Sequence, residues 1–229
     1  DSGVATRPIA DMAAYREQIS HFVNQSGLLM KPVFDLAKKA PKRLVYAEGE
    51  DERVLHAVQT VVDDGLAQPI LIGRPAVVEM RIKKLGLRIR AGEHFELVNP
   101  ESDPRYREYW SEYYRMMQRQ GVTQEYAKRE MRRSSTLIGA MLIRMGAADA
   151  MICGTFAQPS EHLRYVRDVI GLRPGASVFA AMNILLLPNR TLFICDTHVN
   201  LEPTAEQIAE MALLAAEEVR RFGITPKVA

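Results

Sequence analysis

Short apolar runs alternate with amphipathic segments through the middle of the chain. Apolar runs that end in glycine or other turn-forming residues are typical of strands buried in a parallel sheet. Such runs occur at 43–49, 69–73, 94–100 and 148–153. The segments between them carry apolar residues at helical spacing. They predict helices at 51–65, 74–86, 104–121, 123–132 and 134–146.

The last quarter of the chain has a different pattern. Two apolar runs, 177–188 and 190–196, follow one another directly and meet at Pro188-Asn189. Adjacent strand-like runs with a turn-forming pair between them predict an antiparallel hairpin. An amphipathic helix is expected at 202–223, before Gly223 ends the pattern.

These elements predict the fold class and the domain organisation. Alternating strands and helices indicate an α/β fold, with a mostly parallel three-layer sheet and helices on both faces. The hairpin and the last helix indicate the start of a second α/β subdomain. We expect a linker at 1–40, a first subdomain at 41–176 and a truncated second subdomain at 177–229.

An aromatic stripe marks the long helix expected at 104–121. Its members recur at helical spacing: Tyr106, Tyr109, Trp110, Tyr113 and Met117. Large aromatic residues on one helix face favour packing in a core or a subunit interface. A nucleic-acid stacking surface would need a basic pattern beside it, and none accompanies the stripe.

Composition narrows the function classes. The net charge of +2 in 229 residues gives little electrostatic support for nucleic-acid binding. No run approaches the roughly 18 apolar residues of a membrane span, so we expect a cytoplasmic protein without membrane contact. Cys153 and Cys195 lie in apolar runs and are expected to be reduced core residues. The five histidines lack metal-ligand spacing, so no metal site is predicted.

The first strand-to-helix turn, 47–53, is acidic. A dinucleotide-binding turn would need closely spaced glycines so that a pyrophosphate could approach the backbone. Carboxylates repel a phosphate but suit a helix N-terminus. The turn therefore indicates helix capping, with the rim of a ligand cleft as the alternative.

Residues 153–164 are a stronger candidate site, because they follow a buried strand and lead into a helix. Ligands of α/β proteins bind beyond the carboxyl ends of strands. Thr155 and Ser160 offer hydroxyl groups, and Arg164 offers a guanidinium suited to phosphate. The alternative is a capped surface helix with solvated arginines.

A third candidate follows the strand expected at 190–196. Asp196 and Asn200 lie in a polar loop that leads to a helix beginning near Pro203. Pairing of Asp196 with His198 for general-base work is one interpretation. Ordering of the loop by the Asp and Asn side chains is the other.

Several of these residues together carry a family resemblance. The matching positions are Asp149, Gly154, Arg164, Pro174-Gly175, Leu186-Leu187-Pro188, Asp196, Asn200, Pro203 and Ala205-Glu206-Gln207. They resemble the phosphate acetyl/butyryl transferase family over roughly residues 41–229. The resemblance implies two α/β subdomains with a ligand cleft, in which an arginine at the position of Arg164 contacts phosphate.

Within that family, DSGVATRPI, MKPVFDLAKK and PKRLVYAEGEDERVL are similar to the junction in large bacterial NADP-dependent malic enzymes. Active transferases carry a His-Ser/Thr-Thr run where this chain has Ala157-Gln158-Pro159. The family's catalytic Ser-Arg and Asp would lie beyond Ala229. The chain thus resembles the C-terminal regulatory part of such a malic enzyme, as a fragment.

The resemblance leads to a specific functional expectation. The chain is expected to be a non-catalytic acetyl-CoA sensor within a homo-oligomeric malic enzyme, with NADP and a divalent metal bound only by the malic-enzyme part. The expected ligand contacts are Thr155, Ser160, Arg164, Asp196 and Asn200. An active phosphate acetyltransferase is the alternative, and an oligomerisation module built on the aromatic helix is a third class.

Overall fold

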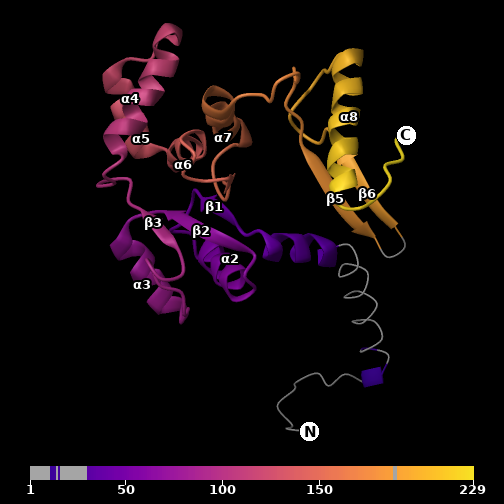
Figure 1. Ribbon diagram of the computed structural model, residues 1–229, viewed down its shortest axis with the longest axis horizontal. Coiled ribbons are helices and arrows are strands. Elements are labelled where there is room, and N and C mark those ends of the chain that lie inside the picture. Colours follow the sequence, from indigo (N-terminus) through magenta and orange to yellow (C-terminus); the bar gives the residue numbers. More distant parts are fainter. Residues whose placement is uncertain (1–10, 14, 16–29, 188–189) are drawn as a thin grey trace. The chain divides into compact units, whose positions relative to one another are not determined.

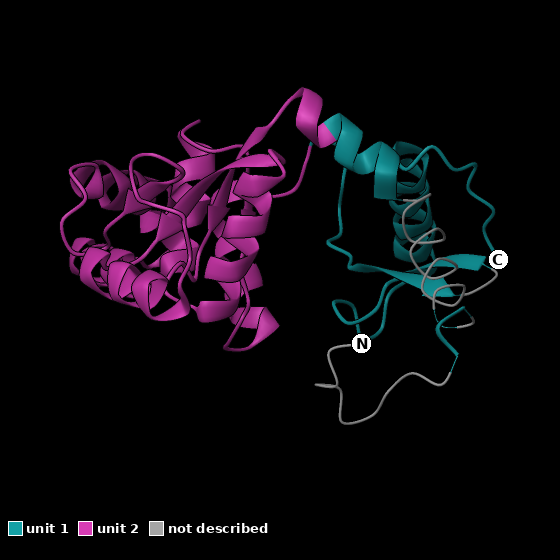
Figure 2. Ribbon diagram, turned by 90° about the horizontal axis from the view of Figure 1, so that it is seen from below, with its two compact units in different colours: residues 1–36, 174–229 teal, residues 37–173 magenta. Residues whose placement is uncertain are grey.

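The computed structural model describes residues 11–13, 15, 30–187 and 190–229. The chain divides into two compact units (Figure 2). One unit comprises residues 37–173, and the other comprises residues 1–36 together with 174–229. Each unit has its own sheet.

A four-stranded parallel sheet organises the unit of residues 37–173. Its strands are β1 (Lys42–Tyr46), β2 (Ala67–Ile72), β3 (Glu96–Val98) and β4 (Ala150–Ile152). They lie in the order β3-β2-β1-β4. The chain therefore leaves β1 toward one side of the sheet and later returns to its other side at β4. This makes the carboxyl ends of β1 and β4 a topological switch point, where α/β proteins place their ligands.

Helices cover both faces of this sheet (Figure 1). The unit's helices are α2 (Glu52–Asp63), α3 (Pro75–Leu85), α4 (Tyr106–Met117), the 3-10 turn Gln118–Gln120, α5 (Gln124–Arg133), α6 (Ser135–Arg144), α7 (Pro159–Tyr165) and a π-helical turn, Val166–Ile170. Successive strand residues point to opposite faces. Val45 accordingly packs with residues of α4 to α6, whereas Tyr46 packs with α2 and α3. The predicted three-layer α/β fold is confirmed.

Polar residues at the helix ends explain where several helices start. The Asp51 carboxylate accepts a hydrogen bond from the backbone N–H of Arg53, which caps α2. Thr123 caps α5 and Ser134 caps α6 in the same way. The capping interpretation of the acidic turn is thus confirmed for Asp51.

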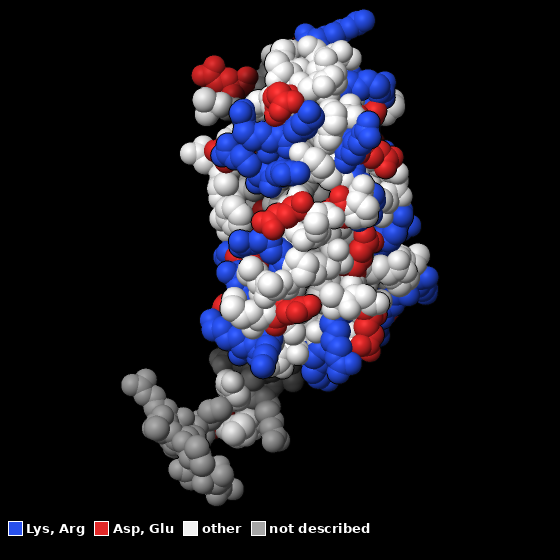
Figure 3. Space-filling view, turned by 90° about the vertical axis from the view of Figure 1, so that its left-hand side faces the viewer, with Lys and Arg blue, Asp and Glu red and all other residues white. Residues whose placement is uncertain are grey.

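The aromatic stripe of α4 packs mainly inside the unit. Tyr109 and Tyr113 are only 2% and 3% exposed. Basic side chains of α5 cover two other members, because the Lys128 Nζ lies 4.9 Å from the centre of the Trp110 ring and the Arg132 guanidinium lies 4.6 Å from that of Tyr106. Figure 3 shows Lys and Arg side chains gathered in a patch in the upper part of this face, with Asp and Glu side chains beside it. The core-packing interpretation of the stripe is confirmed.

The second unit contains an antiparallel hairpin and a long helix. Its elements are β5 (Met182–Leu187), β6 (Arg190–Cys195) and α8 (Ala205–Arg221). Thr204 and Gln207 form a reciprocal capping box at the start of α8. The turn predicted at Pro188-Asn189 lies outside the described residues.

The first strand of the hairpin is shorter than the expected 177–188. Ser177 donates backbone and side-chain hydrogen bonds to Glu210, and the backbone N–H of Ala181 donates to Asp196. These side-chain partners take the place of a strand ladder before Met182. Cys195, the last residue of β6, is exposed rather than buried in a core. No helix in the described part of the chain is long and apolar enough to cross a membrane.

Candidate functional site

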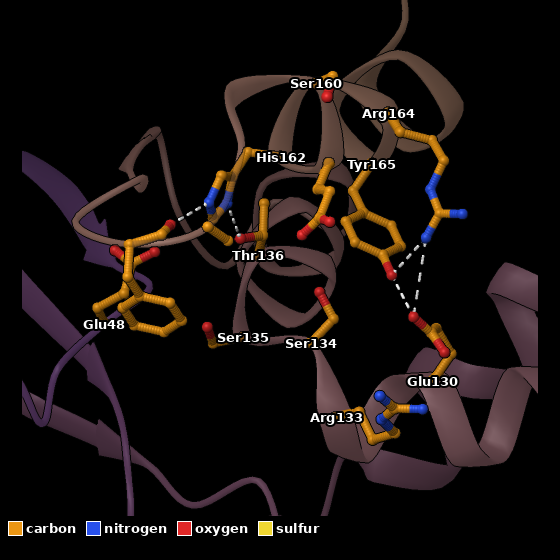
Figure 4. Close-up of a pocket in the computed structure, with 13 residues that line it drawn as sticks. Glu48, Glu130, Arg133, Ser134, Ser135, Thr136, Ser160, His162, Arg164 and Tyr165 are labelled. Atoms are coloured by element: carbon orange, nitrogen blue, oxygen red, sulfur yellow. Dashed lines mark hydrogen bonds and ion pairs between the residues drawn. The ribbon is translucent and has the colours of Figure 1, made fainter.

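A cavity of about 480 Å³ lies beyond the carboxyl ends of β1 and β4, at the switch point of the sheet (Figure 4). The turn after β1, the loop after β4, the end of α5, the start of α6 and α7 all contribute to it. Its lining residues are Glu48, Glu130, Arg133, Ser134, Ser135, Thr136, Phe156, Ala157, Ser160, Glu161, His162, Arg164 and Tyr165. Its size is within the range of small-molecule sites.

One carboxylate joins the two strand-end loops. Glu48 follows β1 and is 6% exposed, and its Oε1 accepts a hydrogen bond of 2.9 Å from the backbone N–H of Gly154. The same carboxylate and the burial of Cys153 raise the pKa of the Cys153 thiol, with burial the larger cause. The thiol is therefore held in its protonated, weakly nucleophilic form. Glu48 serves here to fix the loop after β4.

A second contact fixes the same loop from α6. Thr136 Oγ1 lies 2.8 Å from His162 Nδ1, and His162 Nε2 lies 2.8 Å from the carbonyl oxygen of Phe156. A carbonyl only accepts, so Nε2 donates, and Nδ1 of the neutral ring accepts the Thr136 hydroxyl hydrogen. These contacts hold the loop in a conformation in which Ala157 has φ 67°. This left-handed conformation costs a non-glycine residue roughly 1 kcal/mol.

The guanidinium of Arg164 lies in a small network with Tyr165 and Glu130 (Figure 4). Arg164 Nη2 donates to the Tyr165 hydroxyl oxygen at 2.7 Å and lies 3.8 Å from Glu130 Oε1. The Tyr165 hydroxyl donates in turn to Glu130. Burial, and secondly the bond to Glu130, raise the pKa of Tyr165 to about 12. Tyr165 therefore remains a neutral donor at physiological pH.

The structure brings two of the five predicted site residues into this cavity. Ser160 and Arg164 both line it, on consecutive turns of α7. Thr155 does not line it. Its hydroxyl is buried without a hydrogen-bond partner in the described part of the chain, while its carbonyl accepts from Arg53.

The other two predicted residues lie in the second unit and bind each other. The Asp196 carboxylate accepts hydrogen bonds from the backbone N–H groups of Ala181, Val199 and Asn200. The Asn200 side chain donates to Asp196 and to the carbonyl of Phe179. Partial burial alone would raise the pKa of Asp196, but these hydrogen bonds outweigh it and lower the pKa to about 2. These contacts match the interpretation in which the Asp196 and Asn200 side chains order the loop.

Sequence reasoning missed most of the cavity's other polar residues. Arg133 could have been found from the sequence, because it directly precedes the capping residue Ser134. A basic side chain beside a helix N-terminus indicates a place where an anion can bind. Glu130 and Tyr165 could not have been found in this way, since only the packing of α5 against α7 brings them together. The pair of Thr136 and His162 also joins elements distant in sequence.

The cavity combines groups that attract an anion with the carboxylates of Glu48, Glu130 and Glu161. Arg133 and Arg164 supply guanidinium groups, and the positive end of α6 opens into the cavity. Both nitrogens of His162 are already hydrogen-bonded. Within the described residues, no three His, Cys, Asp or Glu side chains are grouped to hold a metal ion.

Known proteins resemble the whole chain. It is 59% identical to the NADP-dependent malic enzyme of Salmonella typhimurium and 58% identical to that of Escherichia coli, over 229 residues in each case. All of this chain is matched but only 30% of each relative, so the chain spans about a third of their length. A phosphate acetyltransferase of Nitratidesulfovibrio vulgaris is 33% identical over an alignment of 216 residues, which covers 92% of this chain and 30% of that protein.

Solved structures resemble the fold as well. A phosphotransacetylase from Staphylococcus aureus superposes with a TM-score of 0.78 at 25% identity, covering 88% of this chain and 59% of that one. One from Streptococcus pyogenes gives 0.78 at 27% identity, with 89% and 60% covered. The family described as phosphate acetyl/butaryl transferase matches residues 28–229. With its parallel sheet and switch-point cavity, the chain belongs to the phosphate acetyl/butaryl transferase family.

Proposed function

We propose that this chain is a regulatory domain that binds acetyl-CoA and controls a malic enzyme of which it forms part. The phosphorylated portion of the ligand would occupy the cavity at the ends of β1 and β4. Arg164 and Arg133 would balance its charge, and Ser160 would donate a hydrogen bond. In this proposal Thr155, Asp196 and Asn200 keep the loops in shape rather than contact the ligand.

One observation carries the proposal. The cavity contains Arg164, whereas the loop before α7 reads Ala157-Gln158-Pro159 where the family resemblance places a His-Ser/Thr-Thr run. These three offer neither a hydroxyl nor an imidazole. A loop that lacks these groups at 157–159 favours a sensor over an active phosphate acetyltransferase, since transfer requires groups that act on the transition state.

The regulatory part of the proposal rests on the relatives. Those with 50–59% identity are named malic enzymes and are about three times as long as this chain. NADP, a divalent metal and malate would bind in the remaining length of such a protein, and the whole would work as a homo-oligomer. Acetyl-CoA would favour the less active state by binding it more tightly, because a ligand shifts an equilibrium only through differential affinity.

Two measurements on the full-length protein test this function. Calorimetric titration with acetyl-CoA is expected to show saturable binding, whereas a coupled assay with acetyl phosphate and CoA is expected to show no acetyl-CoA formation. Absence of acetyl-CoA binding at physiological concentrations would refute the sensor. Turnover that disappears in Arg164→Ala would instead establish the transferase.

A further inference from the structure

Arg164, the cation best placed for a phosphate, is already occupied by groups of the protein itself. Its Nη2 donates to the Tyr165 hydroxyl at 2.7 Å and lies 3.8 Å from Glu130 Oε1. Its guanidinium carbon is 4.6 Å from the centre of the Tyr165 ring. Figure 4 shows the three side chains converging at one wall of the cavity. A ligand phosphate must therefore compete with Glu130 for this guanidinium.

Burial makes Glu130 an effective competitor. Its side chain is 14% exposed, whereas that of Arg164 is 47% exposed. A carboxylate shielded from water interacts more strongly with a nearby charge than an exposed one, because solvent screens it less. The same burial makes it costly to leave Glu130 without a partner. The Arg164 side chain, by contrast, is free enough to turn toward a ligand.

Glu130 nevertheless keeps a partner when Arg164 leaves. The Tyr165 hydroxyl donates to it, and the pKa of about 12 means that this donor stays protonated at neutral pH. Arg133 lies three residues further along α5, lines the same cavity and has no carboxylate partner in the described part of the chain. Among the described residues, the site thus has one cation without a carboxylate partner, Arg133. The second cation, Arg164, pairs with Glu130 and becomes available when it leaves that carboxylate.

From these contacts we propose that Glu130 is a built-in competitor that sets the anion affinity of the cavity. Without ligand it holds Arg164. A phosphate monoester or phosphoanhydride, carrying more charge than a carboxylate and able to accept two parallel N–H bonds, displaces it. The exchange leaves Glu130 with Tyr165 and gives Arg164 to the ligand. This deepens the function proposed above by naming the residue that tunes the same site.

The test compares Glu130→Gln with the wild type in the full-length protein, by calorimetric titration with inorganic pyrophosphate. The glutamine keeps a hydrogen-bond acceptor for Tyr165 but removes the charge that holds Arg164. A partly exposed ion pair contributes up to about 1 kcal/mol, so pyrophosphate is expected to bind about fivefold tighter. Glu112→Gln is the matched control, because Glu112 pairs with Arg115 outside the cavity, and its affinity is expected to equal that of the wild type.

Tyr165→Phe is a second variant, and its pyrophosphate affinity is expected to change in the opposite direction to that of Glu130→Gln. Removal of the hydroxyl leaves Glu130 with Arg164 alone, so pyrophosphate affinity is expected to fall. Equal or weaker binding by Glu130→Gln, or no binding at all, overturns the competitor, as does tighter binding by Tyr165→Phe. Should Glu130→Gln not fold, as judged by its melting curve, Tyr165→Phe alone decides. The acetyl-CoA titration of the wild type separately decides the proposed function.

Discussion

Single residues determine what the cavity can bind. Arg164 and Ser160 reach it because Pro159 starts α7 directly after the loop that follows β4. Glu48 and His162 hold that loop through Gly154 and Phe156. The chemistry of the site therefore depends on a loop whose shape is fixed from two neighbouring elements.

Arg164→Ala is expected to weaken acetyl-CoA binding by about 10- to 100-fold, because a hydrogen bond to a charged group contributes about 1.5–3 kcal/mol. Calorimetry on the full-length protein measures the loss. Arg167→Ala is the control, since Arg167 pairs with Asp168 and does not line the cavity. Equal losses in both variants would show that the effect is general charge rather than a contact made by Arg164.

Asp196→Asn is expected to lower the melting temperature of the chain at neutral pH, because the carboxylate accepts hydrogen bonds from two backbone N–H groups of its loop and from that of Ala181. The folded pKa of about 2 is below the ordinary value of 3.8. The charge thus stabilises the fold above about pH 4, and this contribution disappears as the pH falls toward 2.

The difference in melting temperature between wild type and Asp196→Asn should accordingly shrink from pH 4 to pH 2, as followed by circular dichroism. Asp64→Asn replaces an exposed carboxylate at the end of α2 and should show no comparable loss. A difference that stays constant across this range would contradict the hydrogen-bonded role of the Asp196 charge.

The residues of the site were only partly predictable from sequence. Arg164 and Ser160 could be found because their position after a buried strand is a local signal. Asp196 and Asn200 had the same local signal, and the structure shows that their side chains bind each other and backbone groups of their own loop and of the segment before β5. Glu130 could not be found, since its partner Tyr165 is 35 residues away and only packing joins them.

Secondary-structure elements were predictable where the apolar pattern decides them. The four parallel strands and the helices around them follow from buried runs and helical periodicity, and their ends from caps such as Ser134 and Gly86. The strand expected from Ser177 does not form before Met182. The side chains of Glu210 and Asp196 accept the hydrogen bonds of the Ser177 and Ala181 backbone N–H groups instead. Such distant partners leave no trace in a local pattern.

The turn between β1 and α2 depends on a close approach to β2. A Cβ at Gly49 would lie 2.8 Å from the Ile72 carbonyl oxygen and 2.8 Å from the Leu71 Cβ. Because backbone atoms cannot move aside easily, Gly49→Ala is expected to destabilise the unit by about 1–3 kcal/mol. Since Glu48 is adjacent, the change should also weaken anion binding.

Unfolding of the 229-residue chain in urea, followed by the fluorescence of its single tryptophan, Trp110, measures this loss. Gly65→Ala is the comparison, because Gly65 has φ +66° but no atom within 4 Å of its Cβ position. It should cost roughly 1 kcal/mol from backbone strain alone and leave anion binding unchanged. A smaller effect at Gly49 than at Gly65 would rule out the close contact as the cause.

At the scale of the whole molecule, the two units divide the chain between a switch-point cavity and a hairpin with one covering helix. The parallel unit has two hydrophobic clusters, one on each face of its sheet, which explains how four short strands can position a cavity. Membership of the transferase family accounts for the fold. The lack of a hydroxyl or an imidazole at Ala157, Gln158 and Pro159 supports the proposed sensing role over catalysis.

Under the proposed function, acetyl-CoA acts on malate oxidation through the cavity that holds Arg164. The most direct test titrates NADP-linked malate oxidation by the full-length protein with acetyl-CoA, in the wild type and in Arg164→Ala. We expect saturable inhibition of the wild type and a curve displaced by at least about tenfold in the variant, as loss of one charged hydrogen bond requires. No response of the wild type, or the same curve for both proteins, would mean that acetyl-CoA does not act through this cavity.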